Sequence, residues 1–225
     1  MSASHDVLRR AHALVFDFDG TLVDSNPIKQ RAFELCFSEF PAQREEILAY
    51  CWGHHHTPRG DKFQYVYERI LRLPYTPAAA AALHERFERA TTRQIIEAAE
   101  VPGASQFLRR AGATHRTAVL SSTPQEVLVQ ILAARGWLAS VHVVQGAPVD
   151  KTNWLAQFRG AYSAHPESVV MFGDTLEDAE AAAGAGCTFV WVGRGRGAGG
   201  GALQVTDFLE FLTDASNSDT IPSRT

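Results

Sequence analysis

Short apolar runs, each followed by polar or acidic residues, recur along the chain and predict buried strands. Continuous runs of this length are typical of strands covered on both faces, as in a parallel sheet. The last four begin about twenty to thirty residues apart, which fits the strand–helix units of a doubly wound α/β fold. The runs are Ala13–Phe18, Arg116–Leu120, Ser140–Val144, Ser168–Phe172 and Cys187–Val192.

The interval between the first two runs is far longer than one crossover helix needs, and its pattern is helical. Ile28, Ala32 and Leu35 keep a helical spacing, and a second set follows Asp61, where a helix is expected to begin. Thr76–Pro77 is typical of an N-cap and first helical residue. We therefore expect residues 25–97 to form an all-helical insertion, and residues 1–24 and 98–225 to form the α/β domain.

Composition and charge narrow the class of protein. The apolar fraction is 45%, as in soluble globular proteins, and the net charge of −4 argues against a general nucleic-acid binder. No run approaches the roughly 18 apolar residues of a membrane span, and residues 1–10 lack the apolar core of a signal peptide. We expect a cytoplasmic protein without a membrane or nucleic-acid partner.

Three features of the sequence are expected to be structural only. Cys36, Cys51 and Cys187 are odd in number and scattered, so we expect buried, inert thiols in a reducing compartment rather than disulfides or a zinc site. The glycine-rich residues 193–202 favour a surface loop over a phosphate-binding loop, because the P-loop ending is missing. Residues 215–225 are polar and are expected to form a frayed tail.

Two pairs of acids follow predicted strands. Asp17 and Asp19 end the first, where residues i and i+2 point the same way, and Gly20 permits a sharp turn. Asp174 ends the fourth run, and Asp178 lies one helical turn on. Carboxylates this close repel, so they require a cation or a proton. For Asp178 an alternative stays open, because Thr175 and Asp178 also match a helix capping box.

Hydroxyl groups and one lysine follow two other strands. Ser121 ends the second run, and either it binds a ligand or it caps the next helix; Ser122 or Thr123 can supply that cap, with Pro124 in the first helical turn. Lys151 begins the helix after the third strand, where the helix dipole disfavours a cation. It either binds an anionic partner or is a solvated surface residue.

These residues together resemble the four motifs of the haloacid dehalogenase (HAD) superfamily in its phosphatase form. Residues 17–25, DFDGTLVDS, match the first motif, Ser121 the second, Lys151 the third, and Gly173–Asp174 with Asp178 the fourth. The motifs follow the family order, and the resemblance covers residues 10–192. It implies a Rossmann-like parallel sheet and identifies the insertion with the C1 α-helical cap of phosphoglycolate phosphatase-like members.

The resemblance implies a mechanism as well. Asp17 would be the nucleophile that forms an aspartyl-phosphate, and Asp19 the general acid/base. Mg²⁺ would be held by the Asp17 carboxylate, the Asp19 backbone carbonyl and the Asp174 carboxylate, with Asp178 nearby. The residues expected to bind the phosphate are Ser121, Ser122, Lys151, Gly20 and Thr21. The small phosphorylated substrate would be a sugar phosphate, a glycerol phosphate or a phosphoglycolate-like molecule.

Asp19 argues against haloacid dehalogenation and phosphonate hydrolysis, since the family members with those activities lack this acid. A phosphomutase of the β-phosphoglucomutase type and a non-catalytic HAD-fold binding module remain alternatives. Substrate contacts are expected from a loop of the cap, residues 52–62, which would precede the helix beginning near Asp61. The candidate residues in that loop are Arg59, His54, His55, His56 and Lys62. The substrate itself and the oligomeric state are left open.

Overall fold

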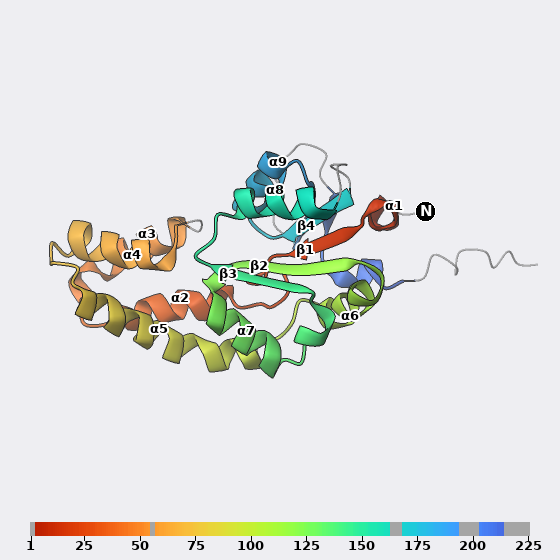
Figure 1. Ribbon diagram of the computed structural model, residues 1–225. Coiled ribbons are helices and arrows are strands. Elements are labelled where there is room, and N and C mark those ends of the chain that lie inside the picture. Colours follow the sequence, from red (N-terminus) through yellow and green to blue (C-terminus); the bar gives the residue numbers. More distant parts are fainter. Residues whose placement is uncertain (1–2, 55–56, 163–167, 194–202, 214–225) are drawn as a thin grey trace, which may run out of the picture. The chain divides into compact units, whose positions relative to one another are not determined.

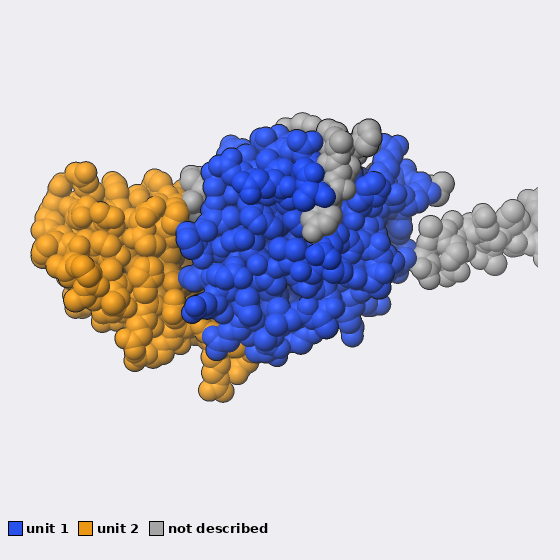
Figure 2. All heavy atoms as spheres, viewed as in Figure 1, with its two compact units in different colours: residues 1–23, 100–225 blue, residues 24–99 orange. Residues whose placement is uncertain are grey.

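The chain forms two compact units. The computed structural model describes residues 3–54, 57–162, 168–193 and 203–213. One unit comprises residues 1–23 and 100–225, the other residues 24–99 (Figure 2). The helical unit therefore includes Asp24, Ala98 and Ala99, which the boundaries expected from the sequence leave out.

The first unit is built on a six-stranded, all-parallel sheet with strand order β3-β2-β1-β4-β5-β6 (Figure 1). The expected parallel α/β architecture is confirmed. In this order the connections run in opposite directions from β1 and β4, and the carboxyl ends of these strands border the crevice where such folds bind ligands. The strands are β1 (Ala13–Phe16), β2 (Arg116–Pro124), β3 (Val143–Ala147), β4 (Val169–Gly173), β5 (Thr188–Val192) and β6 (Leu203–Val205).

Three strands differ clearly from the sequence-based expectation. The second runs to Pro124 rather than Leu120. The third begins at Val143 rather than Ser140, because Leu138–Ser140 closes a 3-10 turn, η3. The short strand β6 was not predicted; it follows the glycine-rich segment and pairs with β5.

Helices cover both faces of the sheet because β1 is apolar on both. All four of its residues are fully buried. Ala13 and Val15 belong to a cluster with residues of α8 (Lys151–Tyr162) and α9 (Leu176–Ala185). Figure 1 shows these two helices together on one side of the sheet, with α6 (Ala104–Thr114) and α7 (Gln125–Ala134) on the other.

The second face is closed by aromatic rings. Phe16 stacks on Phe172 with ring centroids 5.0 Å apart, and Phe107 of α6 stacks on Phe211 at 4.9 Å. Phe211 belongs to η5 (Phe208–Phe211), so the end of the described chain packs against the centre of the sheet. Buried aromatic pairs contribute about 0.5–1.5 kcal/mol each beyond area burial. These contacts therefore stabilise β1 and β4, the strands that precede the acids.

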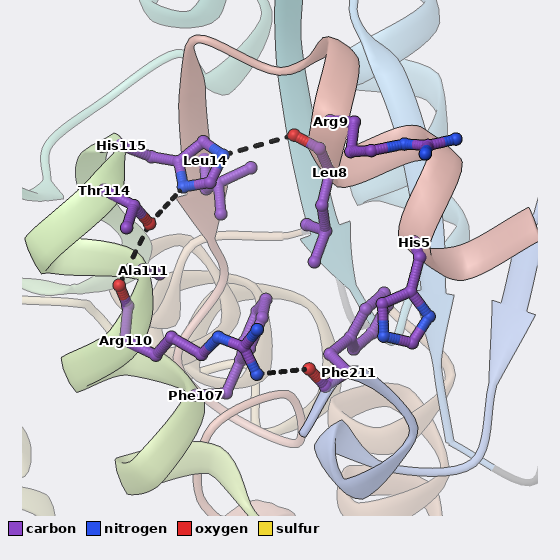
Figure 3. A pocket seen from close by; sticks show the side chains of 10 residues that line it. All are labelled: His5, Leu8, Arg9, Leu14, Phe107, Arg110, Ala111, Thr114, His115 and Phe211. Atoms are coloured by element: carbon purple, nitrogen blue, oxygen red, sulfur yellow. Dashed lines mark hydrogen bonds between the residues drawn. The ribbon is translucent and has the colours of Figure 1, made fainter. Parts of the chain in front are cut away.

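An N-terminal helix, α1 (Ala3–Arg10), was not predicted. It borders a cavity of about 340 Å³ whose floor includes Leu14 and Phe107 (Figure 3). His115 contacts the carbonyl of Leu8 at 3.2 Å, joining α6 to α1. None of the acids at the ends of β1 and β4 lines this cavity.

The second unit is helical and has a core of its own. Phe33, Phe63 and Phe87 meet edge to face at its centre, with centroids 5.0–6.1 Å apart. Thr76 caps α5 as predicted, its hydroxyl accepting from the Ala79 amide at 3.2 Å. The elements are α2 (Asn26–Cys36), η1 (Pro41–Gln43), α3 (Arg44–Gly53), α4 (Arg59–Tyr65), the π-helical η2 (Val66–Ile70) and α5 (Pro77–Glu97).

The three cysteines form no disulfide. Cys36 and Cys51 are buried as expected, whereas Cys187 is half-buried; burial raises the pKa of Cys51 to about 12 and that of the other two to about 11. Residues 194–202 and 214–225 lie outside the described residues, so the expected surface loop and tail stay predictions there. No helix of the described segments is both long and apolar enough to cross a bilayer.

Candidate active site

The first two acids follow β1 directly. The amide of Asp17 donates to the Phe172 carbonyl at 2.9 Å, which continues the β1–β4 ladder by one residue. The chain then turns at Gly20, whose φ of +83° strongly favours glycine. The Gly20 amide donates to the Val23 carbonyl at 2.8 Å. This turn keeps Asp19 beside the sheet edge instead of continuing outward.

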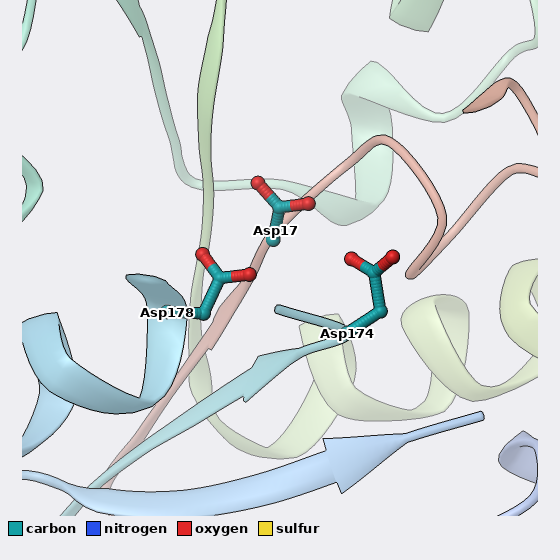
Figure 4. A group of neighbouring side chains, drawn as sticks. All are labelled: Asp17, Asp174 and Asp178. Carbon is teal, nitrogen blue, oxygen red and sulfur yellow. The ribbon is translucent and has the colours of Figure 1, made fainter. Parts of the chain in front are cut away.

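Three carboxylates from different segments gather at this edge. Asp17 follows β1, Asp174 follows β4, and Asp178 lies in the first turn of α9 (Figure 4). One oxygen of each lies within 4.8 Å of the others. Asp17 and Asp178 are buried and Asp174 is half-buried.

A buried ammonium group joins two of these acids. Lys151 Nζ donates to Asp17 Oδ1 at 2.9 Å and to Asp178 Oδ1 at 2.7 Å. The Lys151 side chain is 7% exposed, so it is not a solvated surface residue. Although burial opposes its charge, the two carboxylates raise the pKa of Lys151, and it stays protonated.

One cation does not balance the acids. Burial raises the pKa of Asp17 well above 3.8; Lys151 opposes this, while Asp178, Asp174 and Asp19 raise the pKa further. The cluster is thus short of positive charge and offers only oxygen donors. That donor set and excess of negative charge fit a hard divalent cation such as Mg²⁺.

Asp178 takes part in the helix capping box and also contacts Lys151. Its Oδ2 accepts from the Thr175 amide and hydroxyl in a complete capping box, while Oδ1 binds Lys151. The close approach requires Gly173, because a Cβ there would lie 2.4 Å from the Asp178 Cβ. Thr21, expected to bind phosphate, donates its hydroxyl to Asp174 Oδ1 at 3.1 Å, and its contact with phosphate stays a prediction.

Hydroxyls at the end of β2 face Asp19. Ser121 and Thr123 donate to Asp19 Oδ2, at 3.3 and 2.9 Å. The expected capping role is wrong: β2 continues to Pro124, which takes the N-cap position of α7 without a side-chain cap. Ser122 is exposed between two buried neighbours, as strand alternation requires. Thr123 was missed as a site residue because a threonine before a proline matches a helix start equally well.

The loop between α3 and α4 is shorter than the predicted cap loop, residues 52–62. Trp52 still belongs to α3, and α4 begins at Arg59 rather than Asp61, so both Arg59 and Lys62 are helical. Arg59 pairs with Glu88 at 2.9 Å, and Lys62 donates to the Cys51 carbonyl at 3.1 Å. Both contacts lie inside the helical unit, and the prediction that these two residues bind substrate stays a prediction.

Of the three histidines predicted to contact the substrate, only His54 lies within the described residues. It follows α3, is exposed, and its ring contacts the Tyr50 carbonyl at 2.9 Å. His55 and His56 lie outside the described residues, so their expected role remains untested.

Comparison with known proteins agrees with this arrangement. The chain belongs to the haloacid dehalogenase-like hydrolases, whose family model matches residues 11–186. It is therefore an enzyme of the hydrolase class. None of the curated proteins compared with it matches significantly by sequence.

Solved structures share the fold at low sequence identity. CbbY from Rhodobacter sphaeroides, solved with phosphate, superposes with a TM-score of 0.69 at 20% identity, covering 89% of this chain and 96% of its own. The HAD-hydrolase YfnB from Bacillus subtilis, solved with magnesium, gives 0.68 at 15%, covering 90% and 97%. A haloacid dehalogenase-like hydrolase from Streptococcus pneumoniae gives 0.67 at 18%, covering 91% and 98%.

Proposed function

We propose that the protein is a Mg²⁺-dependent phosphatase that hydrolyses a small phosphorylated metabolite through an aspartyl-phosphate. One observation carries the proposal: buried Lys151 bridges Asp17 and Asp178 at the edge where β1 and β4 end. A lysine buried among carboxylates at the ligand-binding edge of an α/β sheet indicates a functional site, because a helix cap or a surface turn needs no buried ammonium group.

Asp17 is the proposed nucleophile. Its carboxylate oxygen forms a bond to phosphorus as the bond to the substrate's alkoxide breaks, and Asp19 gives that alkoxide a proton. In the second half, Asp19 takes a proton from water while the water oxygen bonds to phosphorus and the Asp17–phosphorus bond breaks. Both carboxylates return to their starting states, with alcohol and inorganic phosphate as products.

Mg²⁺ would be held by the carboxylates of Asp17 and Asp174 and the backbone carbonyl of Asp19, with Asp178 behind them. The cation supplies charge neutralisation, which lets an anionic phosphate approach the acids. The hydroxyl of Thr21 holds Asp174 in orientation, a role that supports a metal ligand.

The phosphoryl oxygens are assigned to this chain's own cation and donors. Lys151 stays charged and lies 2.9 Å from the attacking carboxylate, so it can stabilise charge that develops at phosphorus. Ser121 and the backbone amides of Thr21 and Ser122 complete the proposed set, and the Ser121 hydroxyl would turn from Asp19 to the phosphate when substrate binds. The Gly20 amide, expected in this set, already donates to the Val23 carbonyl at 2.8 Å. The side chains of Thr21 and Ser122 contribute less than the sequence suggested, because one binds Asp174 and the other is exposed.

We propose that the helical unit acts as the cap that selects the substrate. In support, it is a compact unit with its own aromatic core, inserted directly after the first motif. CbbY has been solved in variant form with xylulose-1,5-bisphosphate, so sugar bisphosphates join sugar phosphates, glycerol phosphates and phosphoglycolate as test substrates.

Hydrolysis of p-nitrophenyl phosphate tests the proposal. We expect Mg²⁺-dependent release of inorganic phosphate, loss of activity with EDTA, and no turnover by Asp17→Asn. Normal turnover by Asp17→Asn would refute the assignment of the nucleophile. Transfer of phosphate to a sugar hydroxyl, without free phosphate, would indicate a phosphomutase, and ligand binding without turnover a non-catalytic module.

A further inference from the structure

Thr123 has no role in the proposed mechanism, yet its position is unusual for a structural residue. It is 6% exposed and lies two residues beyond Ser121 on β2. Its hydroxyl donates to Asp19 Oδ2 at 2.9 Å, a shorter contact than the 3.3 Å from Ser121. A bond from a buried hydroxyl to a carboxylate is charge-assisted and stronger than a neutral one.

Both hydroxyls meet the same carboxylate oxygen. The Thr123 amide in turn donates to Ser121 Oγ at 3.1 Å, so the two hydroxyls are held in one arrangement. These donors on Oδ2 restrict rotation of the Asp19 carboxylate and fix where Oδ1 lies, and Thr123 keeps this contact when Ser121 turns to the phosphate.

Gly146 of β3 packs closely against the backbone of Thr123. A Cβ at Gly146 would lie 2.6 Å from the Thr123 carbonyl oxygen, so only glycine permits this approach. Gln125 ties the same junction down, because its amide group accepts from the Gly146 amide and donates to the Val144 carbonyl at 3.2 Å. Thr123 therefore sits on a rigid base with its hydroxyl directed at Asp19.

We propose that Thr123 is a positioning residue that anchors Asp19 through Oδ2, so that Oδ1 carries the proton in both halves of the reaction. The inference rests on the proposed function, since it takes Asp19 as the general acid/base. In the first half Oδ1–H gives its proton to the leaving oxygen, and in the second Oδ1 takes one from water. Oδ2 accepts from Thr123 in either state, so the anchor keeps its own proton throughout.

Three variants separate this role from a packing role. Thr123→Val replaces the hydroxyl by a methyl group of similar size, and Thr123→Ser restores it. Thr117→Val is the matched control, since Thr117 is buried on the same strand and its hydroxyl donates to the Ser140 carbonyl at 2.8 Å, away from the acids. If Thr123→Val does not fold, as judged by circular dichroism, Thr123→Ala removes the hydroxyl without adding bulk.

The readout compares phenyl phosphate with p-nitrophenyl phosphate. The two substrates have nearly the same shape, but phenoxide is the more basic leaving group and depends more on a proton from Asp19. We expect Thr123→Val to lower kcat/KM for phenyl phosphate about tenfold or more. The loss should not exceed the roughly 10²–10⁴-fold that a positioned acid contributes in full. The loss for p-nitrophenyl phosphate should be smaller, Thr123→Ser should recover most of it, and Thr117→Val should match the wild type on both.

Equal losses on both substrates, no loss, or no recovery by serine would overturn the inference while leaving the phosphatase intact. Failure of the wild type and Thr117→Val to hydrolyse either ester with Mg²⁺ would instead overturn the proposed function, and the inference with it.

Discussion

At the scale of single residues, the charge of the site is set by several carboxylates around one ammonium group. Lys151 is within hydrogen-bond distance of Asp17 and Asp178, and Asp174 and Asp19 act on Asp17 as further negative charges. An arrangement that keeps the Asp17 carboxyl buried and close to other acids costs stability, as is common at active sites.

The first prediction concerns Asp17→Asn in the presence of EDTA. The folded-state pKa of Asp17 is raised, so its contribution to stability is full below its ordinary value of 3.8 and is lost as the pH rises through the folded value. Asparagine stays neutral, so at about pH 8 the variant should melt about 2–4 °C higher than the wild type. Thermal melts across the pH range would check this, and a wild type that gains stability relative to the variant with rising pH would contradict it.

The second prediction concerns Lys151→Met. Removing the ammonium leaves the buried Asp178 and Asp17 without their cation, and breaking a buried pair in this way costs about 3–5 kcal/mol. Urea unfolding should show that loss, and Mg²⁺ should raise the melting temperature of the variant more than that of the wild type. Arg109→Met, at an exposed position of α6, is the control and should stay within about 0.5 kcal/mol. Equal stability of both variants would refute the pairing.

At the scale of elements, α9 is held against the end of β4 by a close contact. The third prediction is that Gly173→Ala displaces Asp178, because the new Cβ would lie 2.4 Å from the Asp178 Cβ. We expect a loss of about 1–3 kcal/mol and strongly reduced activity. Gly160→Ala in α8, where no atom lies within 4 Å of the added Cβ, should be neutral or stabilising by up to about 1 kcal/mol. Similar effects of the two substitutions on activity would contradict the prediction.

Elements with a strong local pattern were predictable, and those decided by tertiary contacts were not. The run Ala13–Phe18 indicated a buried strand, and Thr76 a helix start, because both signals are local. By contrast, α1 is short and polar, and β6 has three residues that form a strand only by pairing with β5.

The same holds for the site residues: those marked by a local pattern were predictable, and those placed by tertiary contacts were not. The pattern placed Asp17, Asp19 and Asp174 at the carboxyl ends of strands, but it did not distinguish Thr123 as a helix cap from Thr123 as a partner of Asp19. Arg59 likewise looked like a loop residue after Pro58, although it is the first residue of α4 and pairs with Glu88 of α5. Contacts between residues far apart in sequence decided each of these cases.

At the scale of the whole molecule, the helical unit is inserted between two residues that pair with each other. Val23 and Glu100 form an antiparallel bridge, and the Val101 amide donates to the Leu22 carbonyl at 3.0 Å. Chain ends this close can be joined without stretching the first unit, which contains the whole sheet and its covering helices.

The fourth prediction follows from this closure. A chain in which a short glycine-serine linker replaces residues 24–99 should fold and unfold in one cooperative transition. Its urea m-value should fall by roughly a third, in proportion to the residues removed. Circular dichroism and urea titration would check this, with the intact chain as reference. A broad, non-cooperative transition would show that the first unit depends on the second.

The position of β1 in the sheet also has a consequence for the timing of folding during synthesis. This apolar strand leaves the ribosome well before its partners, the strands that begin at Arg116 and Val169. At about 5–20 residues per second, β1 waits roughly ten seconds or more for its second neighbour. Throughout that interval the chain carries an unpaired hydrophobic segment, so a nascent-chain chaperone has most to protect before β4 is synthesised and pairs with β1.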